Sequence, residues 1–421
     1  MLQTERGSDR AHGAKPAATI RPARWWRDAR RWAALPRGRR LRRPFALLVL
    51  ATLAGASPVT PPPHWSQQQI SQLLTWMSAA DGEGLSAIAL DLPPLRAALA
   101  TGKAEVVDAA ATQAATQLLL AHRDGCCNAA LREGWHIAPD PAWSDAHAAV
   151  ALAVSTGQID ALFSAARPAH PFYQGLRQAY AREQDPDRRA TLAANLDRWR
   201  WMPRDMGHRY LLVNAAGFEA TLWQDNKLIG RWAVVVGKAK SPTPVFRAMV
   251  TGVTFNPWWD IPATIARESV AGMIAHHPRQ AAAKGYVLVH GRYRQKPGPD
   301  NALGRMKLVM PNAFSVYLHD TPAQALFQQN ARAYSHGCIR VGDALGLATT
   351  LLSFQREWDH DRIDALVATG RTQTVALAAP IPVYIAYFTA EPDGDGGARY
   401  FPDIYHRDSG ASPQTGNGAC R

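Results

Sequence analysis

Two short segments in the second half of the chain carry residue types that can perform nucleophilic catalysis. The first contains Tyr317, His319 and Asp320, and the second is the run Ser335–Arg340, which reads SHGCIR. A thiol attacks a carbonyl carbon usefully only as the thiolate, so a catalytic cysteine needs a neighbouring base or positive charge that lowers its pKa, and His319 is the candidate. Cys338 together with His319 therefore predicts a cysteine nucleophile and its base.

The elements around this pair determine which groups can meet. We expect a strand over Ser315–Leu318, and because side chains alternate along a strand, Tyr317 and His319 then project to the same side. Gly337 permits a tight turn whose backbone approaches a substrate closely. The backbone N–H of Cys338, and also that of Gly337, can then donate to a developing oxyanion, with the Tyr317 hydroxyl as a further donor.

The remaining polar residues of SHGCIR have supporting roles in this interpretation. His336 is a second candidate base, but in a tight turn its side chain is expected to point away from Cys338 and to shape the loop. Ser335 is expected to make a local hydrogen bond within the turn. Arg340 either binds a substrate carboxylate through two hydrogen bonds or braces the loop, and the sequence leaves both open.

The positive charge of the chain is concentrated at its N-terminus. The 421 residues carry a formal net charge of +13, and residues 1–43 hold thirteen basic side chains against three acidic ones. Residues 44–421 therefore carry only +3, so we expect no obvious polyanion-binding stripe and no nucleic-acid partner. The length allows two or three domains with a substantial core.

An apolar run, Phe45–Ala56, follows the arginine-rich start. It is too short to span a membrane comfortably but suits a signal peptide that ends in small residues. We expect residues 1–56 to be a leader cleaved after Ala56, and residues 57–64 to be a proline-rich linker. A start downstream of Met1, or retention of the run as a membrane anchor, is also compatible, and Arg42–Phe45 faintly resembles a twin-arginine signal. In each case the mature protein is exported, to the periplasm or cell envelope.

The other cysteines form no recognisable scaffold or metal site. Cys126 and Cys127 are adjacent, which makes a bridge between them strained, and Cys420 lies near the C-terminus. The sequence contains no CxxC or HExxH motif. We interpret these three thiols as buried or incidental, and we predict neither a metal nor another cofactor.

Composition divides the remaining chain into a helical and a β-rich part, which predicts an α+β fold. Residues 65–194 are rich in alanine and leucine with helical periodicity, and their scattered His and Asp residues form no catalytic constellation. Residues 195–408 are expected to be mainly β, and residues 409–421 a loose tail. The predicted strands span residues 209–214, 218–224, 227–236, 247–255, 286–290, 306–310, 315–318, 371–377 and 382–389.

Local signals support two features of the β-rich part. Asp225-Asn226 favours a hairpin turn between two of the predicted strands. Asp343 is placed to cap a helix that continues to about Arg356, behind the nucleophile.

The motifs resemble those of a known enzyme family. His319-Asp320, a spacer of fourteen residues and SHGCIR are similar to the signature of the L,D-transpeptidases with the YkuD fold. The commonest form of that signature has glycine where Asp320 stands. The context resembles the larger, scaffold-bearing YcbB-like branch, and the similarity extends over residues 195–408 through the segments 195–203, 236–237, 242–244, 256–262, 297–305 and 401–405.

This resemblance bears on the segment 263–296, on His290 and on a peptidoglycan-binding module. In such enzymes the segment corresponding to residues 263–296 forms a capping loop over the active site, and here it looks short. His290-Gly291 within it mimics the His-Gly pair of the family but lies 48 residues before Cys338, so we interpret His290 as a strand-end histidine. The peptidoglycan-binding module that members of the branch often carry has no room between Glu183 and Asn195.

The resemblance also implies a reaction. Cys338 attacks the carbonyl between the third and fourth residues of a peptidoglycan tetrapeptide, and terminal D-alanine leaves. The thioester then passes to the side-chain amine of a diamino acid on a neighbouring stem, which gives a 3→3 crosslink. Peptidoglycan stem peptides are thus the expected partner, and their contacts are expected at Arg340, Asp320 and Trp258, although Trp258 and Trp259 also suit packing roles.

Alternatives to this reaction remain open. Water, a free D-amino acid or a lipoprotein lysine as acceptor would make the chain an L,D-carboxypeptidase, an exchange enzyme or an anchoring enzyme. A noncatalytic wall-binding or scaffolding protein is the alternative of another class, and the intact pair of Cys338 and His319 argues against it. The histidine of this family is commonly oriented by a backbone carbonyl, which no side-chain motif reveals.

Overall fold

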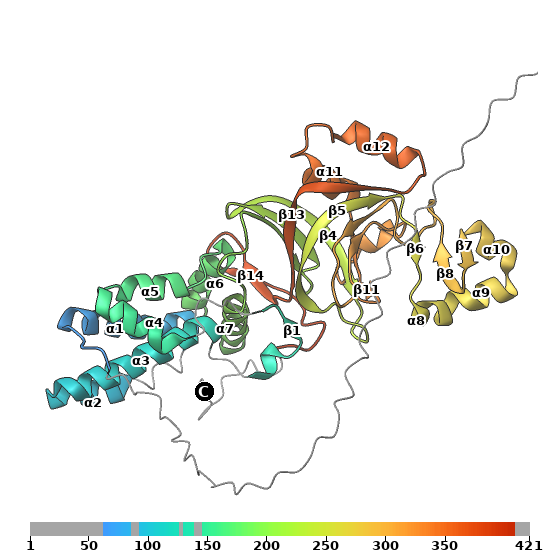
Figure 1. Cartoon of the computed structure of the whole chain (residues 1–421). Helices are drawn as coiled ribbons and strands as arrows, with labels where there is room; N and C mark the ends of the chain where they lie inside the picture. Colours follow the sequence, from blue (N-terminus) through green and yellow to red (C-terminus); the bar gives the residue numbers. More distant parts are fainter. Residues whose placement is uncertain (1–61, 86–91, 126–128, 139–144, 409–421) are drawn as a thin grey trace, which may run out of the picture. The chain divides into compact units, whose positions relative to one another are not determined.

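A computed structural model gives the fold of residues 62–85, 92–125, 129–138 and 145–408 (Figure 1). The predicted leader with its cleavage site, most of the predicted linker and the C-terminal tail lie outside these residues, as do Cys126, Cys127 and Cys420. The structure has a helical region followed by a mainly β region, which confirms the α+β prediction.

The helical region consists of helices whose starts are capped by polar side chains. Ser66 and Gln69 form a reciprocal capping box at the start of α1, and Asp145 and Asp185 each accept the N–H group three residues on, at the starts of α4 and α7. The helices are α1 (Gln67–Ala79), α2 (Leu92–Thr101), α3 (Ala104–Asp124), α4 (Ala146–Thr156), α5 (Ile159–Ala166), α6 (Pro171–Arg182) and α7 (Pro186–Arg200).

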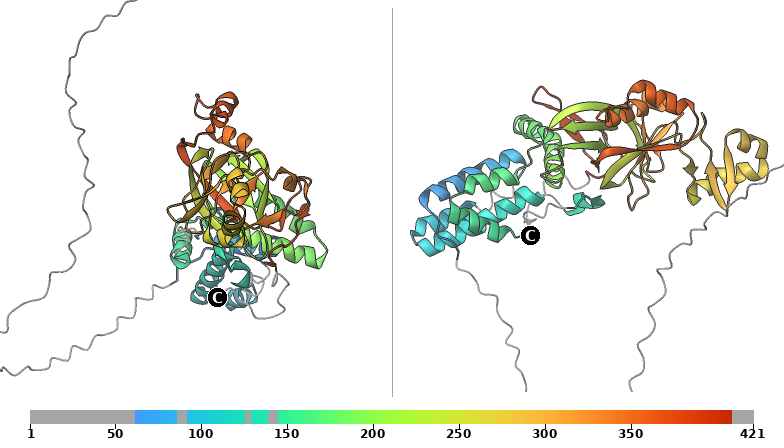
Figure 2. Two further views of the ribbon diagram at one scale, coloured as in Figure 1. Left: turned by 90° about the vertical axis from the view of Figure 1, so that its right-hand side faces the viewer. Right: turned by 45° about the horizontal axis from the view of Figure 1, so that its top comes forward.

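The apolar faces of α1, α3, α4 and α5 meet in one core. Leu73, Leu118 and Phe163 are fully buried in it, and the right-hand view of Figure 2 shows the helices side by side. Burial of these faces, at roughly 25 cal/mol per Å² of apolar surface, holds the bundle together. The expected boundary between residues 194 and 195 falls inside α7, which continues to Arg200.

The β region is built on a sheet that closes on itself. Its strands run in the order β1-β5-β13-β2-β3-β4-β12-β10-β9, β11 pairs with β4, and β9 also pairs with β5. The strands are β1 (Trp135–His136), β2 (Arg209–Asn214), β3 (Glu219–Gln224), β4 (Lys227–Gly237), β5 (Val245–Phe255), β9 (Met306–Val309), β10 (Leu318–His319), β11 (Ala333–Ser335), β12 (Ile339–Val341) and β13 (Gln373–Ala386).

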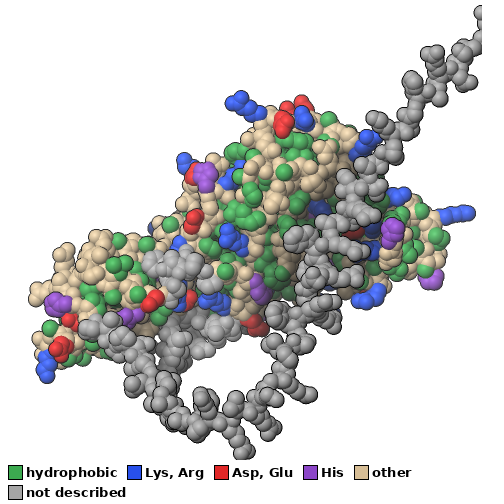
Figure 3. Space-filling view, viewed as in Figure 1, with side chains coloured by type: hydrophobic (Ala, Val, Ile, Leu, Met, Phe, Trp, Pro, Cys, Tyr) green, Lys and Arg blue, Asp and Glu red, His purple; other side chains and the backbone are tan. Residues whose placement is uncertain are grey.

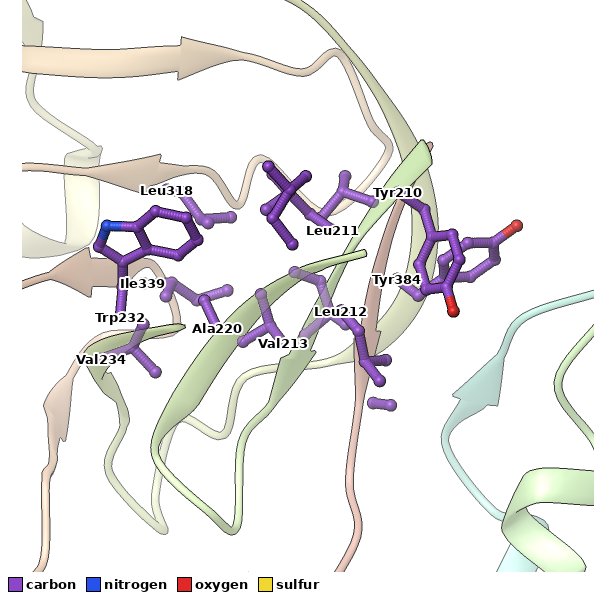
Figure 4. Close-up of a cluster of buried hydrophobic side chains, with 14 of the residues drawn as sticks. Tyr210, Leu211, Leu212, Val213, Ala220, Trp232, Val234, Leu318, Ile339 and Tyr384 are labelled. Carbon is purple, nitrogen blue, oxygen red and sulfur yellow. The ribbon is translucent and has the colours of Figure 1, made fainter. Parts of the chain in front are cut away.

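Apolar side chains from these strands fill the interior of the closed sheet. Figure 4 shows Leu318 and Ile339 among them, beside side chains from β2, β3 and β4. Leu318 and Ile339 are both fully buried. The interior therefore fixes the strands β10 and β12, which carry the two candidate catalytic segments.

Helix α11 (Ala344–Leu352) follows β12 and begins where the sequence predicts. The Asp343 side chain accepts the N–H of Gly346 at 3.0 Å, and the buried face of the helix includes Leu347 and Leu351. The helix ends at Leu352, one turn before the predicted Arg356. Helix α12 (His360–Ala368) follows it, and β14 (Ala390–Pro392) and β15 (Ala398–Tyr400) form a separate hairpin.

Residues 263–296 form a small folded lobe, which we call the cap. It contains α8 (Ala263–Ile265), a π-helical turn (Ala266–Val270), α9 (Ala271–His276), α10 (Pro278–Ala283), β7 (Tyr286–Val289) and β8 (Arg292–Gln295). With β6 (Trp259–Asp260), the strands β7 and β8 make a separate three-stranded sheet. Its core contains Trp259, Ala266 and Leu303, so the segment is a lobe with its own packed interior.

The structure corrects the predicted strands in two places. The strand expected over Ser315–Leu318 is only Leu318–His319, because Ser315 has φ of +55° and so leaves the extended region. The strands expected at residues 371–377 and 382–389 are one strand, β13, with a register irregularity. The turn at Asp225-Asn226 forms as predicted, with positive φ at both residues.

Candidate active site

The register between β10 and β12 brings the two candidate segments together. These strands pair in parallel, with Leu318 opposite Ile339 and His319 opposite Arg340. The N–H of Ile339 donates to the carbonyl of Tyr317 at 3.0 Å. Cys338 therefore lies beside Tyr317 at the end of the pairing.

Strand alternation separates the catalytic candidates from the core. Leu318 and Ile339 point into the interior (Figure 4), so their neighbours His319 and Arg340 lie on the opposite face. The rings of Tyr317 and His319 are near each other, with centroids 5.7 Å apart. His319 and Arg340, 21 positions apart in the sequence, thus share one face of the sheet. Tyr317 lies beside His319, as the sequence predicts.

The imidazole of His319 is held by a backbone carbonyl. Its Nδ1 lies 2.5 Å from the carbonyl oxygen of Asp320, so Nδ1 carries a hydrogen and Nε2 is left as the proton acceptor. The ring is buried, and burial lowers the pKa of His319 to about 4. Arg340 and Lys307 lower this pKa further, whereas the carbonyl of Asp320 opposes them. His319 is therefore neutral near pH 7.

The thiol of Cys338 is half-buried and protonated in this arrangement. Its Sγ donates to the carbonyl of Ser315 at 3.8 Å. Burial raises the pKa of Cys338, while hydrogen bonding from Tyr317 and the positive charges of Arg340 and Lys307 oppose that rise. The sequence predicts a lowered thiol pKa, but here the raised pKa makes the resting pair a neutral thiol and a neutral imidazole.

Tyr317 is placed to interact with the sulfur. Burial and the neighbouring Cys338 raise the pKa of Tyr317, so its hydroxyl stays protonated and can donate. A side-chain hydrogen bond with Trp259, at the edge of the cap, opposes this rise. The phenol therefore has the cap on one side and the thiol on the other.

The turn before Cys338 is fixed by Ser335. Its Oγ accepts the N–H of Gly337 at 3.0 Å and donates to the carbonyl of Cys338 at 2.5 Å, which confirms the predicted local hydrogen bonding. Gly337 has φ of +114°, a conformation that side chains disfavour. Because the Gly337 N–H is already bound to Ser335, the expectation that it also serves an oxyanion is corrected.

Two residues from distant segments brace the same turn. Thr243 Oγ1 donates to the carbonyl of Gly337 at 2.9 Å and accepts the N–H of Gly237 at 2.9 Å. The Tyr405 hydroxyl donates to the carbonyl of Gly237 at 2.6 Å and accepts the N–H of Thr243 at 3.2 Å. This network ties the end of β4 to the residue that precedes the thiol.

Comparison with known families agrees with this geometry. The family described as the L,D-transpeptidase catalytic domain, YkuD, matches residues 208–385, and the family described as the scaffold domain matches residues 60–179. The chain carries a YkuD-type L,D-transpeptidase domain. The preceding scaffold domain is the combination expected for the scaffold-bearing branch.

Individual relatives cover part of the chain. A Haemophilus influenzae protein assigned as an L,D-transpeptidase is 30% identical over 238 residues, which are 52% of this chain and 48% of that protein. The chain thus matches about half the length of this curated relative. A solved L,D-transpeptidase from Mycobacterium smegmatis is 14% identical and covers 42% of this chain and 58% of its own, with a TM-score of 0.24. L,D-transpeptidase 3 from Mycobacterium tuberculosis is 16% identical and covers 42% of this chain and 60% of its own, also with a TM-score of 0.24.

Two predicted residues of the YkuD domain, His336 and Asp320, have partners away from the thiol. His336 is exposed and lies 3.2 Å from the Glu268 carboxylate of the cap, so its ring points away from Cys338 as predicted. Asp320 is buried and accepts two hydrogen bonds from Arg305, at 2.8 Å from the backbone N–H and 2.9 Å from Nε. A substrate contact by Asp320 stays an untested prediction, and its burial gives it a bracing role in this structure.

The tryptophan next to the site is Trp259, whereas the sequence predicts a substrate contact for Trp258. Trp258 stacks against the Arg294 guanidinium, which lies 4.6 Å from its ring centroid. Trp259 is buried in the core of the cap and reaches Tyr317. The group next to the site is therefore Trp259, and the substrate contact predicted for Trp258 stays a prediction.

Sequence reasoning missed several residues of the YkuD domain that act on the site. Lys307 in β9 lies opposite His319 in the register, 5.4 Å from the Tyr317 ring. The alternation in Met306-Lys307-Leu308 could have revealed Lys307, because in a strand its side chain points away from the two buried neighbours. Thr243 and Tyr405 stand in segments 242–244 and 401–405, which resemble the family. No local pattern predicts that Thr243 binds Gly337 or that Tyr405 binds Gly237 and Thr243.

The other histidines with altered pKa values belong to the protein interior. His122 and His170 are buried in the helical region, and burial lowers both pKa values, that of His170 to about 3. His290 is exposed in the β7–β8 turn with φ of +48°. Within the described ranges we find no group of three His, Cys, Asp or Glu side chains able to hold a metal ion. Likewise, none of the helices there is long and apolar enough to cross a membrane.

Proposed function

We propose that the chain is a cysteine-dependent L,D-transpeptidase that acts on peptidoglycan stem peptides. The observation that carries this proposal is the parallel pairing of β10 and β12, which sets Cys338 beside Tyr317 on the face that also holds His319 and Arg340. Thiol, base, hydroxyl donor and guanidinium are the groups that acyl transfer to a sulfur needs. The family match at residues 208–385 supports the same reaction class.

Acylation begins from the neutral pair. As the sulfur of Cys338 attacks the carbonyl carbon of the donor peptide, its proton passes to Nε2 of His319. The tetrahedral intermediate then collapses: the bond to the nitrogen of D-alanine breaks, and that nitrogen takes the proton from His319. The products are a thioester at Cys338 and free D-alanine.

Transfer repeats these steps with a new nucleophile. The side-chain amine of a diamino acid on a second stem attacks the thioester and gives its proton to His319. The carbon–sulfur bond breaks, and the thiolate takes the proton back from His319. The result is a 3→3 peptide bond and the original thiol, so no oxidant, metal or nucleotide enters the balance.

The oxyanion and the donor peptide have separate partners in this proposal. The Tyr317 hydroxyl, kept protonated by its raised pKa, and the backbone N–H of Cys338 donate to the developing oxyanion. Arg340 forms no ion pair with a carboxylate among the described residues, and its guanidinium is assigned to a carboxylate of the stem peptide. Lys307, which faces the same site, adds to that positive field.

The acceptor and the compartment belong to the same proposal. Water, a free D-amino acid or a lipoprotein lysine would use the same thioester, and no described group distinguishes them from the stem amine. Because peptidoglycan lies outside the cytoplasm, we place the reaction in the periplasm or cell envelope, which agrees with the leader expected over residues 1–56.

Purified full chain and tetrapeptide muropeptides, followed by mass spectrometry, test the proposal. We expect equal amounts of 3→3 dimer and D-alanine from the native chain, none from Cys338→Ala, and native amounts from Cys420→Ala as the matched control. Release of D-alanine without dimer would indicate the carboxypeptidase, and an inert native chain that binds the wall would indicate the noncatalytic alternative.

A further inference from the structure

The folded part of the chain concentrates its positive charge in the cap. Residues 263–296 contain six Lys and Arg residues and one acidic residue, Glu268, a net charge of +5. Residues 44–421 as a whole carry +3, so without the cap that part has a net charge of −2. The near balance expected from the sequence therefore conceals a strongly basic lobe, because the remainder of residues 44–421 carries a net charge of −2.

The charges of the cap face solvent and lack ion-pair partners. Five of its six basic side chains are exposed, and none of these five forms an ion pair with any residue in the described ranges. Figure 3 shows Lys and Arg side chains at the surface of this lobe. The sixth, Arg294, pairs with Asp260 at 2.6 Å. The exposed five are Arg267, Arg279, Lys284, Arg292 and Lys296.

The cap also contacts the active site at two points. Trp259, from the sheet that β6 forms with the strands of the cap, belongs to the apolar cluster against which Tyr317 packs. Glu268 of the cap lies 3.2 Å from His336, two residues before the thiol. The cap therefore contacts the segment that carries the reacting sulfur.

We propose that the exposed basic surface of the cap is a docking surface for carboxylate-bearing peptidoglycan, and this inference rests on the proposed function. Each tetrapeptide ends in a carboxylate, so a strand presents a row of negative charges to the five side chains. A single surface ion pair contributes little, but several on one polymer add up and attract it over about 8 Å at physiological salt. The cap would thus supply the wall affinity of the module that this chain lacks between Glu183 and Asn195.

An anionic membrane is the competing partner for a basic surface. The observations favour the wall polymer, because the cap contacts the segment that carries the thiol with which that polymer reacts. Membrane binding is therefore treated as one outcome of the test.

Co-sedimentation of the full chain with purified insoluble peptidoglycan tests the docking surface. Cys338→Ala is present in every variant, so that binding is measured without turnover. The cap variant is R267Q/R279Q/K284Q/R292Q/K296Q. The matched control, R96Q/K103Q/K227Q/R356Q/R371Q, removes five exposed charges elsewhere. Vesicles of phosphatidylglycerol and phosphatidylethanolamine serve as the membrane probe, and thermal unfolding checks that each variant is folded.

We expect the cap variant to bind peptidoglycan about tenfold more weakly than the control variant, a difference that vanishes between about 20 and about 300 mM NaCl. Equal binding by the two folded variants would overturn the proposal, as would binding to vesicles but not to peptidoglycan. Failure of the proposed function gives a different pattern: the native chain would form no dimer and release no D-alanine, while salt-sensitive docking by the cap would persist.

Discussion

Thr243 Oγ1 donates a hydrogen bond of 2.9 Å to the carbonyl oxygen of Gly337, the residue directly before the thiol. The same oxygen accepts the N–H of Gly237 at the end of β4. A single side chain thus links the sheet to a backbone whose φ of +114° is disfavoured outside glycine. Thr243 acts through Gly337, which makes it a positioning residue for Cys338.

Thr243→Val should loosen this turn. It leaves two buried backbone groups without a partner, at a cost of about 1 to 3 kcal/mol each in the free energy of unfolding. We expect the rate of D-alanine release to fall at least tenfold, with rescue by Thr243→Ser, which keeps the hydroxyl. Thr254→Val, which removes the hydroxyl that faces Thr374, is the control. A Thr243→Ser variant as slow as Thr243→Val would show that shape, and not the hydrogen bond, matters.

Tyr317→Phe removes the hydroxyl that faces the thiol while keeping the ring beside His319. If this hydroxyl donates to the oxyanion, kcat should fall by about 100-fold, while KM changes little. Alkylation of Cys338 by a small neutral reagent should continue, because that reaction forms no oxyanion. Unchanged kcat would remove Tyr317 from the oxyanion site and leave it a packing partner of Trp259.

The raised pKa of Cys338 predicts how its reactivity depends on pH. Burial stabilises the neutral thiol, so alkylation in the absence of substrate should still be rising at the ordinary thiol pKa of about 8.5. Arg340→Gln should shift the curve further upward, because the guanidinium lowers this pKa. An alkylation rate that levels off near pH 6 would instead reveal a resting thiolate paired with protonated His319.

The lowered pKa of His319 predicts acid sensitivity. The folded chain holds His319 neutral down to about pH 4, whereas the unfolded chain takes up this proton near the ordinary value of about 6.5. The contribution of His319 to the free energy of unfolding is therefore fully present above pH 6.5. It decreases by about 3 kcal/mol as the pH falls toward 4.

Denaturant unfolding at pH 7 and pH 4 isolates this contribution. The pKa values of His122 and His170 are lowered as well, so the native chain must be compared with His319→Gln. Between pH 7 and pH 4 the free energy of unfolding of His319→Gln should fall by about 3 kcal/mol less than that of the native chain. His290→Gln, on the exposed β7–β8 turn, is the matched control. Equal losses in the native chain and His319→Gln would mean that the imidazole is already charged in the folded state.

Much of this site follows from local sequence, and the remainder depends on distant contacts. Strand alternation suffices to place Tyr317 with His319, and the Asp343 cap and the Asp225-Asn226 turn follow from side-chain chemistry. The hydrogen bonds of Thr243 to Gly337 and of Tyr405 to Gly237 join residues far apart in the sequence, which no local pattern encodes.

Burial explains why the expected lowering of the thiol pKa does not occur. His319 near Cys338 suggested a lowered pKa, but burial of the thiol raises it, and the positive charges of Arg340 and Lys307 only partly oppose this rise. Burial depends on how β10, β12 and the cap surround the site, so it cannot be inferred from the spacing of His319 and Cys338. The uneven distribution of charge, by contrast, can be counted in the sequence. It indicates a basic surface only once residues 263–296 are known to form one lobe.

Intact-protein mass spectrometry of the acyl-enzyme tests the central claim most directly. After brief mixing with a tetrapeptide donor and no acceptor, the native chain should gain the mass of the tripeptide acyl group, and peptide mapping should place it on Cys338. His319→Gln should acylate at least 100-fold more slowly, and Cys338→Ala should gain no mass. Acylation of another residue, or an unmodified native chain that nevertheless releases D-alanine, would contradict the account.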